Sequence, residues 1–169
     1  KIAQMHGATI VWTPVLLGGI FQATGNKSPA EVPTKGLYSN VDLQRWAKAY
    51  GVTFQMNPHF PINTLPLMRG AVAMQLRGEV EFHRYLEAVF SALFERPRNL
   101  NLPAEIGAVL IDAGLDPLEF MAQIGNQAVK DRLKQNTTNA VSRGVFGAPT
   151  FFVGDEMYWG QDRLQFVAE

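Results

Sequence analysis

Hydrophobic positions follow a β-strand spacing near both ends of the chain. Residues 8–15 are rich in β-branched and aromatic side chains, which is typical of a buried strand. Residues 150–153 and 156–159 are two short extended runs that flank the turn Gly154-Asp155, and this arrangement predicts a β-hairpin. Because an isolated hairpin is not stable in water, we expect the hairpin and residues 8–15 to share one sheet.

Between these extended segments the apolar spacing is helical. After Ser39, apolar side chains recur on one helix face, and Gly51 is the expected end of that helix. The whole helical block is therefore expected to be an insertion in an α/β unit. Further helices are predicted in four places: from Asn63 to about 95 with a break near Gly78, from Asp116 with Pro117 in the first turn, over about 127–143, and from Gly160 onward.

Three segments break these patterns. Residues 18–35 are rich in glycine and proline and are predicted to form a long loop, which in a compact domain is usually functional or disordered. Residues 57–61 contain two prolines, so neither a central strand nor a helix is expected there. Residues 1–6 have the character of the last turns of a helix, with Gly7 as its C-cap. Since they lack an initiator Met, we expect the natural N-terminus to lie before Lys1.

Composition narrows the functional classes. The 169 residues suffice for one domain, and 15 basic residues balance 15 acidic ones, which argues against a nucleic-acid-binding protein and a polybasic membrane anchor. No apolar run approaches the roughly 20 residues of a membrane helix. The lack of cysteine excludes disulfides, cysteine-based zinc sites and a CxxC redox pair from this chain, and is compatible with a cytoplasmic location. Three scattered histidines lack a metal-binding spacing, so no metal site is expected.

The segment that leads into the hairpin carries the strongest signal for a binding site. A proline follows a small residue and directly precedes a β run at Ala148-Pro149-Thr150, which predicts a fixed bend. The surrounding Gly-Ala-Pro-Thr-Phe-Phe sequence favours a cis peptide bond before Pro149 over a trans proline at the start of an edge strand. Such a bend exposes the peptide groups of Ala148, which can pair with an extended peptide as an added strand would.

Three separated segments together resemble one family. Residues 144–154 with 159–164, residues 24–35 and residues 57–65 are similar to the 2-hydroxychromene-2-carboxylate isomerases, which are relatives of kappa-class glutathione transferases and DsbA-type oxidoreductases. The resemblance covers nearly the whole chain. It implies an α/β, thioredoxin-like fold with an inserted all-helical subdomain, whose N-terminal strand and start of the first helix are missing here. The expected single domain places residues 1–38 and 144–169 in the thioredoxin-like part and about 39–143 in the insertion.

The resemblance implies glutathione as cofactor and places its γ-glutamyl group at Gln161-Asp162. The Asp162 carboxylate suits the γ-glutamyl ammonium, and the backbone N–H groups of a helix start suit the neighbouring carboxylate. Gln161 is expected to act as the N-cap or as a side-chain donor there. The backbone of Ala148, held open by Pro149, would pair with the cysteinyl part. The structural alternative for Asp162 is plain helix capping.

Asn26 and Lys35 match family positions near the bound tripeptide, where a cation such as Lys35 would suit the glycyl carboxylate. A solvated surface lysine is the alternative for Lys35. Asn57 and His59, in a loop bracketed by prolines, are candidates for substrate binding, although a surface or structural role competes for His59. The catalytic serine of the family lies before Lys1, so the catalytic residue is unknown from this chain.

The resemblance implies an isomerase that uses reversible addition of the glutathione thiolate to isomerise 2-hydroxychromene-2-carboxylate or a similar intermediate of aromatic-compound catabolism. The expected partners are a small aromatic substrate and a second copy in a homodimer. Three alternatives stay open. They are a kappa-like transferase that leaves glutathione on its product, a DsbA-type disulfide oxidoreductase, and a non-catalytic module that binds glutathione or a peptide.

Overall fold

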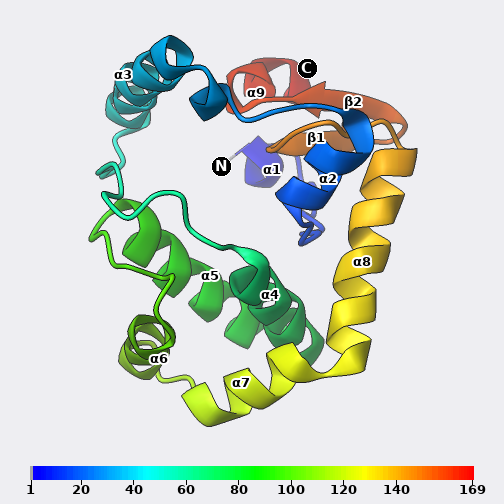
Figure 1. The fold of residues 1–169 in the computed structure, drawn as a ribbon. Coiled ribbons are helices and arrows are strands. Elements are labelled where there is room, and N and C mark those ends of the chain that lie inside the picture. Colours follow the sequence, from blue (N-terminus) through cyan, green and yellow to red (C-terminus); the bar gives the residue numbers. More distant parts are fainter. Residues whose placement is uncertain (1) are drawn as a thin grey trace. The chain divides into compact units, whose positions relative to one another are not determined.

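The computed structural model describes residues 2–169 and divides the chain into two compact units (Figure 1). Unit 1 combines the two ends of the chain, up to Asn26 and from Lys134 to Glu169, and unit 2 is Lys27–Leu133. The predicted single domain, with its insertion at about 39–143, stays a prediction. None of the helices described in residues 2–169 combines the length and apolar character that a membrane crossing requires.

Unit 1 is built around an antiparallel hairpin. β1 pairs with β2 in the register Thr150↔Trp159 to Val153↔Glu156, and Gly154 in the turn has a φ of 59°. The predicted hairpin is therefore confirmed (Figure 1). The elements of unit 1 are α1 (Ile2–Met5), α2 (Leu17–Thr24), the second half of α8 (Gln127–Ser142), β1 (Thr150–Val153), β2 (Glu156–Trp159), a 3-10 turn (Gln161–Arg163) and α9 (Leu164–Val167).

The prediction that residues 8–15 form a buried strand is wrong. They have no regular secondary structure and join no ladder, because the sheet described within residues 2–169 consists of β1 and β2 alone. Ile10 and Val11 are 57% and 84% exposed. The end of the segment is fixed instead by α8, where Asn136 Nδ2 donates to the Pro14 carbonyl at 3.0 Å. β-branched composition indicates a side chain that suits a pleated surface, but a strand also needs a paired edge. The helix before this segment, α1, ends shortly before Gly7, whose φ is 62°, so the predicted helix end is confirmed. Lys1 lies outside the described residues.

The prediction of one long loop over residues 18–35 is also wrong. α2 occupies its first part and ends at Gly25, whose φ of 72° is a left-handed C-cap. A 3-10 turn, Pro29–Glu31, follows, and α3 (Pro33–Tyr50) then begins earlier than the predicted Ser39. The reason lies in Pro33, which occupies the first turn of α3, whereas the Ser39 hydroxyl donates to the Lys35 carbonyl at 2.8 Å.

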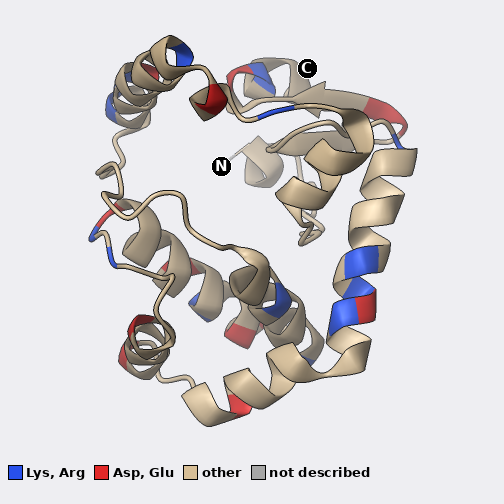
Figure 2. Cartoon of the chain, viewed as in Figure 1, with Lys and Arg blue, Asp and Glu red and all other residues tan. Residues whose placement is uncertain are grey.

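Unit 2 contains the main hydrophobic core, formed where α4, α5, α6 and α7 pack together. Tyr85 and Phe120 are fully buried at its centre, with their ring centroids 5.8 Å apart. Phe90 lies on the outer side of α5 and is 58% exposed. The charged residues of α8 lie in the half of the helix nearer to α7 (Figure 2). The elements are α3, α4 (Leu65–Arg77), α5 (Glu79–Phe94), α6 (Pro103–Asp112), α7 (Pro117–Gly125) and the first half of α8.

The helix limits of unit 2 follow the predicted signals. Gly51 ends α3 with a φ of 67°, and Gly78 separates α4 from α5. The Asp116 carboxylate accepts from the backbone N–H of Leu118 at 2.8 Å and of Glu119 at 3.3 Å, so it is the N-cap of α7. These predicted helix limits are confirmed.

Tyr85→Phe is expected to make the protein less sensitive to alkali. Burial raises the pKa of Tyr85 well above its usual value of 10.0, and its hydroxyl donates to the Leu67 carbonyl at 2.7 Å. The unfolded chain therefore loses this proton first, so the free energy of unfolding falls as the pH rises above about 10. Phenylalanine has no hydroxyl proton to lose, so this decline in stability with pH disappears. The loss of the hydrogen bond to Leu67 lowers the free energy of unfolding by about 1 kcal/mol at pH 7. Urea unfolding between pH 8 and 11 tests this, and an equal decline in both proteins would contradict it.

Candidate functional site

The loop before β1 has the predicted cis peptide bond between Ala148 and Pro149. Both sides of the loop are fixed, because the Thr150 hydroxyl donates to the Gly147 carbonyl at 2.7 Å and the Gly160 N–H donates to the Pro149 carbonyl at 2.9 Å. Ala148 itself is exposed, and its N–H and carbonyl have no hydrogen-bond partner among residues 2–169. The loop therefore presents one open peptide edge of the kind that pairs with an extended ligand.

An aromatic pair lies directly beside this edge. The rings of Phe146 and Trp159 are 5.0 Å apart. A Cβ atom on Gly147 would lie 2.6 Å from the Trp159 indole nitrogen, so the backbone and the indole can approach this closely only because residue 147 is glycine. Sequence reasoning missed this pair, whose members are separated by the hairpin.

Asn26 reaches this loop from a distant part of the sequence. It follows the Gly25 cap of α2, and its Nδ2 donates to the Phe146 carbonyl at 2.8 Å. The side chain thus holds the loop from the side of α2. This contact gives Asn26 a positioning role, and its expected contact with the bound tripeptide stays a prediction.

Gln161 and Asp162 follow the hairpin, joined to the loop through Gly160. Gly160, with a φ of 99°, occupies the N-cap position that was predicted for Gln161. The expected last helix is only the 3-10 turn and the four residues of α9, so a helix dipole contributes little there. The Asp162 carboxylate, 39% exposed, pairs with the Arg163 guanidinium. The turn therefore carries a half-exposed carboxylate next to a guanidinium, and binding of a ligand ammonium by Asp162 would have to compete with Arg163.

Arg143 is a further charged residue of unit 1 that sequence reasoning missed. Its guanidinium lies 3.5 Å from the centroid of the Phe152 ring, a cation–π contact on β1. No local spacing signals this contact, because α8 and β1 are brought together only by the turn at Gly144.

The other candidate residues belong to unit 2. Lys35 lies in the first turns of α3, at an open depression that it lines with Pro29, Thr34, Tyr38 and Ser39. Within residues 2–169, no group of three or more His, Asp or Glu side chains is arranged to hold a metal.

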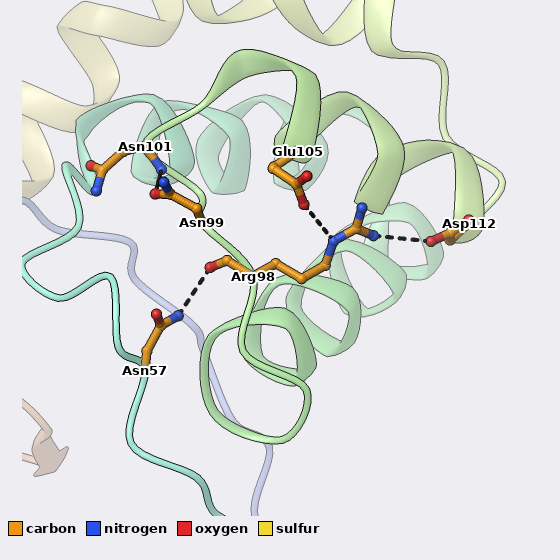
Figure 3. Close-up of polar contacts among 6 residues, drawn as sticks. All are labelled: Asn57, Arg98, Asn99, Asn101, Glu105 and Asp112. Carbon is orange, nitrogen blue, oxygen red and sulfur yellow. Dashed lines mark hydrogen bonds and ion pairs between the residues drawn. The ribbon is translucent and has the colours of Figure 1, made fainter.

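Asn57 is buried and shapes its loop (Figure 3). Its Nδ2 donates to the carbonyls of Leu93 at 3.2 Å and Arg98 at 3.0 Å, and its Oδ1 accepts from the His59 N–H at 2.9 Å. All its polar atoms therefore contact the backbone. His59 is exposed, and a second cis bond, Phe60-Pro61, follows it. The substrate-binding role of both residues stays a prediction, and the geometry gives Asn57 a structural role.

Comparison with known proteins agrees with the resemblance read from the sequence. The family model of a DSBA-like thioredoxin domain matches residues 1–169. The 2-hydroxychromene-2-carboxylate isomerase of Pseudomonas putida is 34% identical over 97% of this chain and 80% of the relative. Glutathione S-transferase kappa 1 of Homo sapiens is 28% identical, over 92% of this chain and 74% of its own.

A solved structure of a 2-hydroxychromene-2-carboxylate isomerase superposes with a TM-score of 0.86 at 31% identity, covering 99% of this chain and 81% of that one. The thioredoxin-like fold expected from the sequence is thereby confirmed.

Proposed function

Since the chain belongs to the DSBA-like thioredoxin family and, within it, to the 2-hydroxychromene-2-carboxylate isomerases, we propose that glutathione is its cofactor. The chain is an isomerase. The proposed reaction is cis–trans isomerisation of 2-hydroxychromene-2-carboxylate or a similar intermediate of aromatic-compound catabolism. The proposed assembly is a homodimer.

The observation that carries the proposal is the open peptide edge of Ala148 beside the Asp162 turn. An extended tripeptide with an ammonium group at one end fits these two features, because the edge offers one donor and one acceptor and Asp162 offers the negative charge. The Gly160–Pro149 hydrogen bond at 2.9 Å joins the two features and sets their spacing. The residues present therefore fit glutathione.

Each proposed binding residue of unit 1 then has a separate role. Ala148 binds the cysteinyl backbone, and Asp162 binds the γ-glutamyl ammonium. Asn26 holds the loop through Phe146, and the exposed aromatic pair of Phe146 and Trp159 offers an apolar contact beside the edge. Glutathione, when bound, supplies a thiol that adds reversibly to a conjugated double bond and is released unchanged. Lys35 remains a proposed contact to the glycyl carboxylate of glutathione, and Asn57 and His59 remain proposed contacts to the substrate.

We expect isomerisation by the full-length protein to require glutathione without consuming it. The reaction is followed by absorbance with and without glutathione, and the product is weighed by mass spectrometry. S-methylglutathione is the matched control, because it keeps both carboxylates and the ammonium but has no reactive thiol, and it is expected to inhibit. Turnover that is unaffected by glutathione would contradict the proposal.

A kappa-like transferase is the second candidate, favoured by the 28% identity to the human kappa-class protein. It leaves glutathione bonded to the product, so a product mass increased by one glutathione would identify it and exclude the isomerisation cycle.

A further inference from the structure

Helix α5 of unit 2 has one buried side and one exposed side. Its buried residues face α4 and α6 and belong to the main core (Figure 1). The opposite side carries four exposed residues at spacings of four, three and four positions, which we call the α5 stripe: His83, Glu87, Phe90 and Phe94. This is the spacing with which one helix packs along another. Because all four are exposed, neither α4 nor α6 covers this side of α5.

The aromatic part of the α5 stripe continues beyond the helix. The ring of Phe54 stacks on that of Phe94 with centroids 6.1 Å apart, and the ring of Phe90 lies 5.9 Å from Phe94 on α5. The Gln55 N–H donates to the Phe94 carbonyl at 2.6 Å and so fixes the segment of Phe54 against the end of the helix. Three adjoining rings on an open helix side are typical of a surface that binds another protein.

This aromatic surface lies between two charged groups that have no ionic partner in their own chain. Glu87 forms no hydrogen bond or ion pair within residues 2–169. Arg96, two residues after Phe94, donates from Nη2 to the Ser91 hydroxyl at 3.2 Å but pairs with no carboxylate in the same described range. The Ser91 hydroxyl donates to Glu95 Oε2 at 2.8 Å, so the Glu95 carboxylate is bound at the end of its own helix.

A second copy of the chain complements this pattern. When two α5 helices lie antiparallel with Phe90 of one protomer opposite Phe94 of its partner, two-fold symmetry brings the other two rings together as well. The same register places Glu87 level with position 97 of the partner, about 1.5 Å along the helix axis from Arg96. Glu87 and Arg96 then form two reciprocal ion pairs. A partner with charge of one sign would leave one of these groups unpaired, whereas a second copy supplies both.

We propose that the α5 stripe, together with Phe54, is the surface through which two copies of this chain form a homodimer. The inference rests on the proposed function, which includes a homodimer, and it identifies the interface. Association removes the exposed rings of both protomers from water and pairs them with each other, which is the main favourable contribution. The ion pairs at the two ends set the antiparallel register.

The first test is Phe90→Asp in the full-length protein, followed by sedimentation equilibrium. The substitution places a carboxylate at the centre of the apolar contact, so we expect the dimer Kd to rise about 100-fold or more. Leu118→Asp is the matched control, because Leu118 on α7 is an exposed apolar residue of the same unit, and it should dimerise as wild type does. Circular dichroism checks that each variant is folded.

The second test reverses the charges. Glu87→Arg and Arg96→Glu should each raise the dimer Kd about tenfold, and the double variant should return close to the wild-type value, because it restores both ion pairs with opposite polarity. A double variant no better than the single ones would overturn the antiparallel register. A dimer that persists in folded Phe90→Asp would overturn this interface and leave the proposed homodimer intact. A monomeric wild-type protein would overturn both.

Discussion

Gly70→Ala is expected to destabilise the protein by about 2–4 kcal/mol. Gly70 is buried on α4 against the Tyr85–Phe120 stack at the centre of unit 2. A Cβ atom there would overlap Phe120 and the Tyr85 hydroxyl and would lie 2.8 Å from Tyr85 Cζ. Neither ring can yield easily, because both are fully buried and the Tyr85 hydroxyl is bound to the Leu67 carbonyl. The overlap therefore outweighs the gain of about 1 kcal/mol in helix propensity.

Gly107→Ala on α6 is the matched control. Its Cβ atom would lie 3.8 Å from Pro117 Cβ, an ordinary van der Waals contact. Because nothing overlaps, only the higher helix propensity of alanine changes the stability. This variant should therefore be about 0.5–1 kcal/mol more stable than wild type. Urea unfolding followed by circular dichroism compares the three proteins. Equal effects of the two substitutions would contradict the close packing of Gly70 against Tyr85 and Phe120.

Local signals explain which parts of the fold the sequence predicts. The end of α3 at Gly51 and the start of α7 at Asp116 depend on residues within one turn of the boundary, so their sequence is enough to locate them. Residues 8–15 depend on a paired edge that no local pattern describes. The glycines of α2 favour a loop by composition, but Gly19 has a packing role, because a Cβ atom there would lie 3.2 Å from Thr137 Cγ2.

The candidate site also combines residues that a local sequence signal predicts with residues that only distant contacts bring together. Ala148-Pro149 is a contiguous motif, and its cis bond follows from the adjoining residues. The contact from Asn26 to Phe146 joins residues 120 positions apart, and only the resemblance pointed to Asn26.

Asp162→Asn is expected to weaken glutathione binding about 10- to 100-fold, which corresponds to about 1.4–2.7 kcal/mol. The substitution keeps the size and shape of the side chain and removes the charge that the proposed site offers to the γ-glutamyl ammonium. The folded protein should barely change in stability, because the Asp162–Arg163 pair is 39% and 49% exposed and such surface pairs contribute at most about 1 kcal/mol. A loss of affinity can therefore be attributed to binding and not to unfolding.

Asp155→Asn is the matched control, because it removes one carboxylate from the same unit at the exposed hairpin turn and leaves the net charge change identical. Calorimetric titration at two salt concentrations should show an affinity loss for Asp162→Asn alone. An equal loss in both variants would assign the effect to the overall charge of unit 1, since long-range attraction is screened by salt and a direct contact much less so. Wild-type affinity in Asp162→Asn would remove Asp162 from the site and leave recognition to the Ala148 edge and the other proposed contacts.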